Sequence, residues 1–384
     1  MIQMTHRERV LMALNHNDPD RIPIDLGGTH DTGIVLEAYK QLKKYLGIKS
    51  KTILAGELDQ LAKIDEEILK RFGIDTRRLV PKTPEKWKGE LFPDGSMSDM
   101  WGVKWRKVEE GHYYPCDFPL KGDLNASDLN RYQWPNPDDL SDLEEFEIEA
   151  RTLHVDTDYA IVMYFPGRLM SLGCYLRGFE DWLIDLLVNQ SFAEALMERG
   201  LEIQLEIGGK LLAAAGNFVD IIHISDDLGT QNAPMISPEL YRKLIKTRQR
   251  KLFDFIRGRT EAKIFFHSDG CVYPLIADFI EIGVDILNPV QVGAQDMDPK
   301  KLKREFGSQL CFWGAVDTQH ILPFGTPQDV QNEVRRRIEE LGHKGGYVLS
   351  AVHNILNEVP PENVCAMFDA ALGYGRYPLH IQHS

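Results

Sequence analysis

The feature that most constrains the fold of this chain is a regular alternation in its second half. From about residue 159 onward, short apolar runs are separated by longer amphipathic ones. Short apolar strands that alternate with amphipathic helices are typical of βα units on a parallel sheet. The six runs are YAIVMYF (159–165), VDIIHI (219–224), AKIFFH (262–267), VDILN (284–288), QLCFW (309–313) and GYVLS (346–350).

Two segments of the first half complete the set of strands. RIPIDL at 21–26 and DTRRLV at 75–80 have the length of strands, and with the six runs above they make eight. Eight βα units predict a (β/α)8 TIM barrel, a fold of the α/β class. We expect residues 1–384 to form one barrel domain, because a barrel of this kind is longer than a typical single domain.

Capping residues mark the expected starts of the helices. Three of them stand directly before a proline, a combination that favours the first turn of a helix. These capping residues are Ser237, Asp298 and Thr326. Ser191 with Glu194 predicts the start of a long helix that runs to about residue 215. We also expect helices at 33–46 and 58–72.

The first half carries two additions to the barrel. Thr5 and Glu8 predict a capping box for an N-terminal helix within residues 1–20. Residues 81–158 contain the alternating segment MWGVKWRKVEEGHYYP, which is typical of a β-hairpin. We interpret residues 81–158 as an insertion after the second strand, at the mouth or side of the barrel, that does not fold alone.

The composition excludes several classes of partner. The net charge is −14 and no cluster of Lys and Arg is present, so we expect neither nucleic acid nor anionic lipid as a partner. The five cysteines are widely spaced without a CxxC motif, which argues against a disulfide framework and agrees with a reducing compartment. No signal peptide or membrane-spanning run is recognisable, so we expect a soluble cytoplasmic protein.

Polar residues follow five of the predicted strands. The active site of an α/β barrel lies at the carboxyl ends of its strands, so the first polar residues after each apolar run are candidates for it. They are Ser225-Asp226-Asp227, His267-Ser268-Asp269-Gly270-Cys271, Asn288 with Gln291, Asp317, and His353-Asn354. Any one of them could be an ordinary loop residue, but the ring as a whole indicates a functional site.

Three of these residues form a candidate metal site. His267 and Asp269 are two positions apart at a strand end, where alternate side chains point the same way. With His353 they make a ligand set that suits zinc and leaves one position open for a substrate. We also expect His353 to approach Asp25, because the first and last strands are neighbours in a closed barrel. The alternative is that each histidine is a hydrogen-bonded loop or core residue.

Motifs of other enzyme classes are missing. The chain has no GxGxxG after a strand, no P-loop and no GxSxG elbow, so dinucleotide binding, phosphoryl transfer and serine hydrolysis lack support. We expect His223, which lies inside its strand, to be structural. We expect Cys271 to be a buried spectator rather than a nucleophile.

Long segments of the chain resemble the uroporphyrinogen decarboxylase superfamily over nearly its whole length. They are THRERVLMALNHNDPDRIPIDLGG, FPGRLMSLGCYLRGFEDWL, DDLGTQNAPMISPELYRKLIKTRQRKLFDFI, FFHSDGCVYPLIADFIEIGVDILNPVQ and GGYVLSAVHNILNEVPPENVCAMFDAA. The hairpin segment and the DDLGTQ segment look closer to the corrinoid-linked methyltransferase branch than to the decarboxylases. Members of both branches are α/β barrels, so the resemblance implies the same fold.

The resemblance also implies site residues. The thiol-activating methyltransferases of this branch bind zinc through a His-x-Cys after strand five and a Cys near the last strand. Here His267 matches the histidine, Asp269 replaces the first cysteine and His353 lies in the region of the second. This harder ligand set still suits Zn²⁺ but does not point to a thiol acceptor. The decarboxylases carry an arginine-rich segment near the first strand, where this chain has only Arg21.

The resemblance therefore implies a corrinoid-dependent methyltransferase with zinc-assisted activation. It would move a methyl group between a small substrate, of the methyl ether, amine, thiol or folate class, and the cobalt of a corrinoid. The corrinoid would be carried on a partner protein, and the chain could form a homodimer. The expected catalytic residues are His267, Asp269, His353 and Asp227, and the expected metal ligands are His267, Asp269 and His353. The expected substrate-binding residues are Asp25, Asp226, Gln231, Asn288 and Asn354.

Two alternatives remain open at this point. The main one is a cofactor-independent decarboxylase of the uroporphyrinogen decarboxylase type, in which Asp25 or His353 stabilises a protonated ring. The other is a barrel that binds a corrinoid or a sugar-like ligand without turnover.

Overall fold

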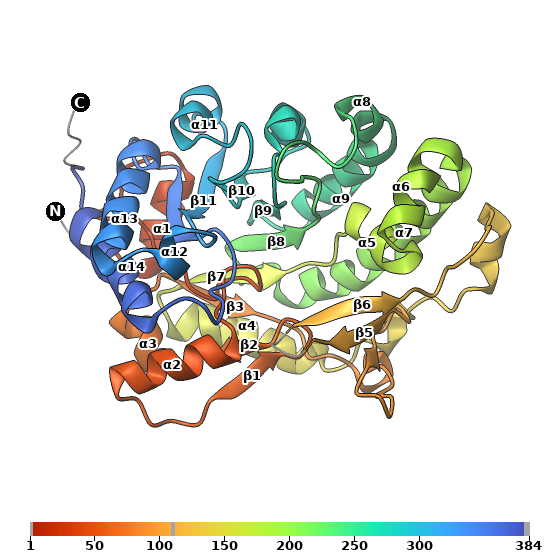
Figure 1. The fold of residues 1–384 in the computed structure, drawn as a ribbon, viewed down its shortest axis with the longest axis horizontal. Coiled ribbons are helices and arrows are strands. Elements are labelled where there is room, and N and C mark those ends of the chain that lie inside the picture. The colour runs from red at the N-terminus through yellow and green to blue at the C-terminus, as the bar shows by residue number, and fades with distance from the viewer. Residues whose placement is uncertain (1–2, 109–111, 380–384) are drawn as a thin grey trace.

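The centre of the molecule is a curled sheet of seven parallel strands with helices around its outside (Figure 1). The computed structural model describes residues 3–108 and 112–379. The strands lie in the order β12-β11-β10-β9-β8-β7-β3, so neighbours in space follow the chain order. They are β3 (Thr76–Leu79), β7 (Ala160–Tyr164), β8 (Ile221–Ser225), β9 (Lys263–His267), β10 (Ile286–Asn288), β11 (Cys311–Val316) and β12 (Tyr347–Ala351).

The segment around Ile24 fills the gap between the first and last strands of this sheet. Its backbone bonds β12 through Leu349, whose N–H donates to Pro23 O at 2.9 Å and whose carbonyl accepts from Asp25 N at 2.9 Å. On its other side, Ile24 O accepts from Asp75 N at 2.9 Å, directly before β3. The predicted eight-stranded barrel is therefore confirmed, with a first strand that forms only a short bridge.

The helices follow the strands as βα units require. They are α2 (Leu36–Leu46), α3 (Glu66–Arg71), α4 (Leu143–Asp156), α5 (Met170–Arg177), α6 (Phe179–Val188), α7 (Gln190–Ala215), α8 (Pro238–Tyr241), α9 (Thr247–Arg257), α10 (Ile276–Glu281), α11 (Pro299–Phe306), α12 (Ile321–Phe324), α13 (Pro327–Leu341) and α14 (Pro361–Tyr374). Ser237, Asp298 and Thr326 accept hydrogen bonds from backbone N–H groups at the starts of α8, α11 and α13, as predicted. None of the helices among the described residues is long and apolar enough to cross a membrane.

Two of the predicted helix boundaries are wrong. Helix α7 begins at Gln190 and its N-cap is Asn189, so Ser191 lies inside the helix. The predicted helix at 58–72 is broken, because a short hairpin of β1 (Ile53–Gly56) and β2 (Leu61–Lys63) occupies its start and only α3 is helical. The hairpin pairs Ala62 with Leu54 and turns the chain toward the mouth of the barrel.

Helix α1 (His6–Leu14) closes the amino-terminal end of the barrel. The predicted capping box of Thr5 and Glu8 is present at its start. Its residues Val10 and Leu14 are buried in one cluster with inward-facing side chains of β7 to β12, among them Trp313. The helix therefore acts as a plug at the end opposite to the site.

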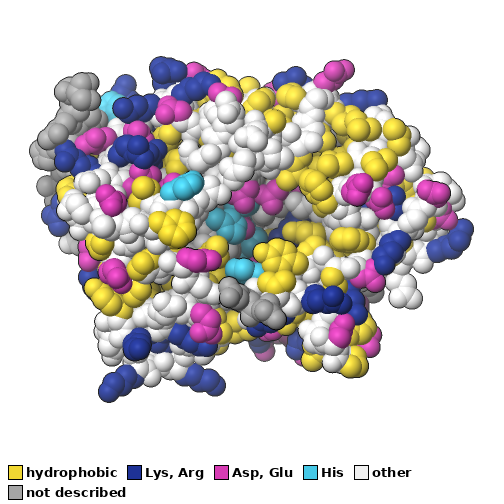
Figure 2. Space-filling model, in the orientation of Figure 1, with side chains coloured by type: hydrophobic (Ala, Val, Ile, Leu, Met, Phe, Trp, Pro, Cys, Tyr) yellow, Lys and Arg dark blue, Asp and Glu magenta, His cyan; other side chains and the backbone are white. Residues whose placement is uncertain are grey.

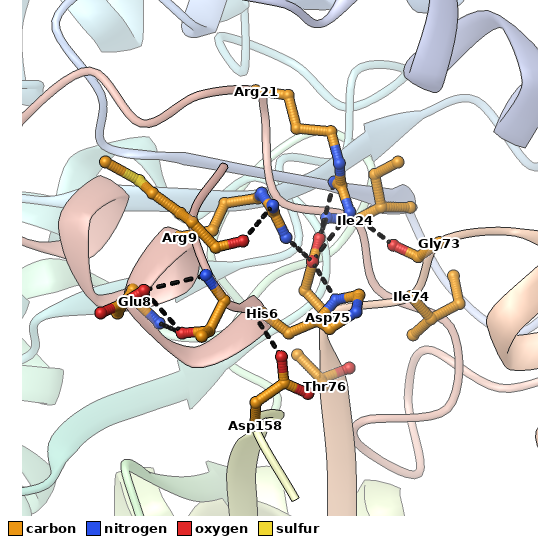
Figure 3. A network of polar contacts seen from close by, with 12 residues as sticks. His6, Glu8, Arg9, Arg21, Ile24, Gly73, Ile74, Asp75, Thr76 and Asp158 are labelled. Carbon is orange, nitrogen blue, oxygen red and sulfur yellow. Dashed lines mark hydrogen bonds and ion pairs between the residues drawn. The ribbon is translucent and has the colours of Figure 1, made fainter. Parts of the chain in front are cut away.

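Asp75 ties this plug to the barrel (Figure 3). Its carboxylate is fully buried and accepts hydrogen bonds from Arg9 Nη1 at 2.7 Å, Arg21 Nη1 at 2.8 Å and Ile24 N at 2.8 Å. His6 Nδ1 lies 2.7 Å from the same carboxylate. Burial alone would raise the pKa of Asp75, but His6 and the two arginines lower it overall.

Between β3 and β7 the chain forms a small antiparallel sheet over the mouth of the barrel. Its strands are β4 (Met97–Ser98), β5 (Lys104–Lys107) and β6 (Tyr113–Asp117), so the predicted hairpin is confirmed, although its residues 109–111 lie outside the described part. The Trp105 ring packs 5.3 Å from the Tyr175 ring of α5. Tyr113 N donates to Leu58 O at 3.1 Å, in the turn between β1 and β2.

Candidate functional site

The carboxyl ends of the strands meet in a hollow on one face of the molecule. Figure 2 shows histidine and acidic side chains gathered at the centre of this hollow, with hydrophobic side chains around it. This is the end of an α/β barrel at which active sites lie. The contacts below define which of these side chains meet.

Asp31, in the loop after the first strand, has four imidazoles around its buried carboxylate. His223 Nε2 hydrogen-bonds it at 2.7 Å, and His30 Nε2 lies 3.0 Å from its other oxygen. The other two are more distant, His267 Nδ1 at 3.6 Å and His353 Nε2 at 3.9 Å. One carboxylate therefore connects residues from the first, fourth, fifth and eighth strands.

The loop that carries Asp31 depends on two glycines. Gly27 has a φ of +77°, a conformation that favours glycine, and its N–H donates to Thr32 O at 2.7 Å. A Cβ on Gly28 would lie 2.4 Å from Asp25 Oδ1, so only glycine fits there. The resulting tight turn directs the chain back over the end of the barrel.

The surroundings shift the pKa values of His30, His223 and His267 in different directions. Burial lowers the pKa of His30 and of His223, so these two rings are neutral hydrogen-bond partners. Burial would also lower the pKa of His267, but the carboxylates of Asp31, Asp269 and Asp227 raise it to about 10. The position beside His267 therefore strongly favours a positive charge.

His267 has one ring nitrogen fixed and the other available. Its Nδ1 lies 2.6 Å from Asn288 Oδ1, and Asn288 Nδ2 donates to Trp313 O at 3.1 Å, which orients the amide. The Nδ1 proton is thus directed at Asn288, and Nε2 faces Asp227 Oδ1 and Asp269 Oδ2, each at 3.8 Å. Metal-binding histidines commonly have this second-layer hydrogen bond.

His353 completes the group from the last strand. Its Nε2 is 4.0 Å from Asp269 Oδ2, and the rings of His353 and His267 are 5.6 Å apart. Its side chain is 39% exposed, so the group is open toward the hollow on this side. The structure thus brings His267, Asp269 and His353 together as the sequence suggested, with Asp227 beside them.

Several imidazoles and carboxylates at this mouth lie close enough together to be candidate ligands of a cation. Zinc bonds of 2.0–2.2 Å to N and O place neighbouring ligand atoms roughly 3.3–3.6 Å apart in a tetrahedral site. The separations of 3.8 to 4.0 Å around Asp269 exceed this by a few tenths of an ångström. Three overlapping sets of candidate ligands occur among the described residues: His30, Asp31 and His223; Asp31, His267 and His353; and Asp227, His267 and Asp269. The predicted combination of His267, Asp269 and His353 is not among these three sets.

Two of the predicted substrate-binding aspartates are occupied by structural contacts. Asp25 accepts hydrogen bonds from Thr76 Oγ1, from Gly28 N at 2.9 Å and from Trp313 Nε1 at 3.1 Å. Among the described residues its predicted neighbour His353 is not one of its polar partners, and His353 Nε2 lies 3.9 Å from Asp31 Oδ1 instead.

Asp226 differs sharply from its neighbour Asp227. Its buried carboxylate accepts from the backbone N–H groups of Leu169 and Met170, each at 3.1 Å, and of Ser171 at 2.8 Å. These groups begin α5, so Asp226 anchors that helix to the end of β8. Burial raises the pKa of Asp226 to about 6 despite these hydrogen bonds.

The three predicted amide ligands also have other roles. Asn288 orients His267 as described above, from a fully buried position. Asn354 Oδ1 accepts from Gly33 N at 2.6 Å and so fixes the start of the chain that leads to α2. Gln231 is an exposed loop residue whose carbonyl accepts from Gln295 N at 2.8 Å. Asn288 is thus in direct contact with His267, and the side-chain oxygen of Asn354 bonds the backbone of Gly33.

Asp31, His30 and His223 also belong to the site, although they were not predicted as members of it. The sequence signal was present, because His30 and Asp31 follow the first strand as the other candidates follow theirs. His223 lies within β8, but its ring points into the barrel and bonds Asp31. Its expected structural role therefore extends to positioning the central carboxylate.

Comparisons with known proteins agree on one family. A family model described as "Uroporphyrinogen decarboxylase (URO-D)" matches residues 124–374. A uroporphyrinogen decarboxylase from Alcanivorax borkumensis is 21% identical over 383 residues, 95% of this chain and 96% of that protein. One from Geotalea daltonii is 26% identical over 216 residues, 53% of this chain and 58% of that protein.

A solved structure shares the fold over almost the whole chain. It is a methyltransferase from Methanosarcina mazei, with a TM-score of 0.65 and 19% sequence identity. The match covers 97% of this chain and 99% of that one. At this identity the likeness concerns the fold.

Proposed function

The chain belongs to the uroporphyrinogen decarboxylase family, and within it we propose a methyltransferase that moves a methyl group between a small substrate and the cobalt of a corrinoid. The observation that supports this proposal is the group of His267, Asp227, Asp269 and His353 around one position that favours a positive charge. The shared fold with the Methanosarcina methyltransferase is consistent with it. The corrinoid and the protein that carries it follow from the resemblance.

His267, Asp269 and His353 would hold a divalent cation, with zinc as the best match to their chemistry. When bound, such a cation acts as a Lewis acid on the oxygen, nitrogen or sulfur that carries the methyl group. Asn288 keeps His267 Nε2 directed at this position, and Asp227 lies where it can exchange a proton with the same heteroatom. Asp31 holds His30 and His223 and fixes the floor of the site.

Decarboxylation is the second candidate, because the curated relatives are named uroporphyrinogen decarboxylases. A porphyrinogen carries several carboxylates, which need cations around the mouth. Asp31, Asp227 and Asp269 lie there, with Arg168 as a cation beside His30. At an effective dielectric constant of about 20, one like-charge contact at 4 Å costs about 4 kcal/mol. A substrate with few negative charges avoids this repulsion.

Metal analysis combined with a spectral assay for methylcobalamin tests the proposal. We expect roughly stoichiometric zinc in the purified chain and its loss in His267→Ala, with unchanged circular dichroism. His343→Ala, an exposed histidine in the loop before β12, is the matched control and should keep its zinc. Full activity of metal-free protein would overturn the metal assignment. Release of carbon dioxide from uroporphyrinogen at a rate typical of decarboxylases would overturn the methyltransferase assignment.

A further inference from the structure

Helix α6 lies at the outer edge of the molecule and carries large apolar side chains on its exposed side (Figure 1). Four of them are between 48% and 79% exposed: Phe179, Ile184, Leu187 and Val188. Residues three or four apart are neighbours on a helix surface, and the half-buried Leu183 links Phe179 to Leu187. These five side chains form one continuous surface, the α6 patch.

Such an outer face is unusual for a helix at a protein surface. Helix α13 shows the ordinary pattern, with Val330 and Val334 buried and Asn332 and Arg336 exposed. A helix that is hydrophobic on all sides is normally covered on all sides. Exposed apolar patches of neighbouring side chains mark contact sites with other molecules. The α6 patch therefore indicates a contact that lies outside the single chain.

The inner side of α6 fixes the helix to the barrel without help from the patch. Trp182 is buried against Gly173 of α5, where a Cβ would lie 2.0 Å from the indole ring. Arg177 Nε donates to Asp185 Oδ2 at 2.7 Å, and both side chains are buried. The outer side chains are thus presented on a firmly held helix.

Charges of opposite sign lie at the two ends of the patch. Glu180 and Asp181 are exposed in the first turn of α6, and neither has a cation within 4.0 Å among the described residues. Lys243 lies near the other end, because its Nζ donates at 2.7 Å to Oε1 of Gln190, two residues after Val188. Within the described chain, Lys243 also has no ion-pair partner.

We propose that the α6 patch is the contact of a homodimer, in which the α6 helices of two copies pack antiparallel about a twofold axis. In such a contact the same surface serves both copies, so apolar side chains meet apolar side chains. The acidic start of each α6 then lies opposite Lys243 of the other copy. Antiparallel packing also brings the helix dipoles into a favourable arrangement.

A second copy fits the patch better than a partner of another kind. The acid at one end and the base at the other are self-complementary only when the same surface is present twice in antiparallel order. Permanent homodimer contacts are also more apolar than transient ones. A carrier that shuttles a methyl group binds and leaves in every cycle, which favours a more polar contact. The inference does not depend on the proposed function.

Sedimentation velocity of the full chain tests the dimer. We expect a species of twice the chain mass of 43.9 kDa at micromolar concentrations. Leu187→Glu places a charge within the patch and should weaken the dimer about 100-fold or more, with unchanged circular dichroism. Val155→Glu, at a 70% exposed position of α4, is the matched control and should leave the dimer intact. A wild-type chain that stays monomeric up to about 100 µM, or a dimer that survives Leu187→Glu, would overturn the inference.

Charge reversal tests the antiparallel arrangement. Glu180→Lys and Lys243→Glu should each weaken the dimer about tenfold, because each places like charges opposite one another. The double variant restores opposite charges and should dimerise about as tightly as wild type. Because Glu180 and Lys243 form no ion pair within the described chain, this restoration reports a contact between copies. A double variant that dimerises no more tightly than the single variants would overturn the arrangement.

Discussion

Two buried aspartates, at opposite ends of the barrel, show how differently one fold uses the same side chain. Asp75, at the amino-terminal end, has two arginines, a histidine and a backbone N–H within 2.9 Å of its carboxylate (Figure 3). Asp31, at the mouth, has two histidines within 3.0 Å and two more at 3.6 and 3.9 Å.

The difference lies in the partners. Arginine stays charged at all accessible pH values, so the Asp75 network has a fixed charge and saturated hydrogen bonds. Histidine can release its proton and offer a lone pair, so the Asp31 group can exchange protons or accept a metal ion. The longer distances at Asp31 leave room for such a change. The contacts at the amino-terminal end therefore favour stability, and those at the mouth favour proton exchange or metal binding, as is typical of α/β barrels.

The largest effect should come from removing the charge at the amino-terminal end. Asp75→Asn leaves Arg21 buried without its carboxylate, and breaking a buried ion pair in this way costs about 3–5 kcal/mol. We expect urea unfolding at neutral pH to show a loss of that size, while the fraction that remains folded keeps its activity. Asp369→Asn, which breaks an exposed pair with Arg71, is the control and should cost less than about 1 kcal/mol. Similar losses in both variants would contradict the structural role of Asp75.

The same substitution at the mouth should affect activity instead. Asp31→Asn removes the carboxylate that hydrogen-bonds His223 and favours positive charge beside His267, so we expect kcat/KM to fall about 10²- to 10³-fold. Unfolding should change less than in Asp75→Asn. Asp317→Asn is the control, because among the described residues Asp317 bonds its own loop, through Gln319 N and His320, and should stay within about twofold of wild type. Wild-type activity in Asp31→Asn would remove this carboxylate from the mechanism.

Acid should weaken the Asp75 network in a defined pH range. Burial would raise the pKa of Asp75, but His6, Arg21 and Arg9 lower it, so the folded-state pKa lies below the unfolded value of about 4. The resulting stability is complete above about pH 4 and is lost as the pH falls through the folded-state pKa. We expect the stability difference between wild type and Asp75→Asn to shrink below about pH 4 in chemical unfolding experiments. A difference that stays constant at acid pH would show that the charge is not its origin.

The fold could be predicted from the sequence because its signal is local. Each βα unit repeats the same pattern of an apolar run and a capped helix, so eight strands and three proline-linked caps could be recognised in advance. The hairpin of β1 and β2 was not predicted, because its strands are short. The apolar residues of 58–72 also have a spacing that suits a helix.

The site could be predicted only in part, because its contacts depend on how loops pack. His267, Asp269 and His353 were accessible because they follow strands directly. Asp226 and Asp227 are adjacent in the sequence, but Asp226 accepts from three backbone N–H groups at the start of α5, whereas Asp227 accepts from Asp269 N. The cavity between the inserted sheet and helices α5 and α7 could not be predicted from the sequence, since it depends on how the insertion packs on the barrel.

The smallest expected effect concerns an exception at the amino-terminal end. Lys303 of α11 donates to Gly345 O at 2.6 Å, and no carboxylate lies within 4.0 Å of it in the described part of the chain. Burial lowers the pKa of Lys303 to about 8, with the Cys311 thiol and Asp18 opposing that change. The positive charge of Lys303 is therefore less stable in the folded chain than in water. The charges of the arginines around Asp75 behave in the opposite way.

The sign of its pH dependence follows from the lowered pKa. Between about pH 8 and about 10.5 the unfolded chain binds more protons at Lys303 than the folded chain, so its contribution to stability becomes more favourable as the pH rises. Lys303→Met removes this dependence, so its stability relative to wild type should fall by up to about 3 kcal/mol across that range. Lys300→Met, on an exposed position of the same helix, should track wild type in the same unfolding series. Parallel curves for wild type and Lys303→Met would mean that Lys303 is as well solvated as a surface lysine, and that the amino-terminal end holds no unbalanced charge at this position.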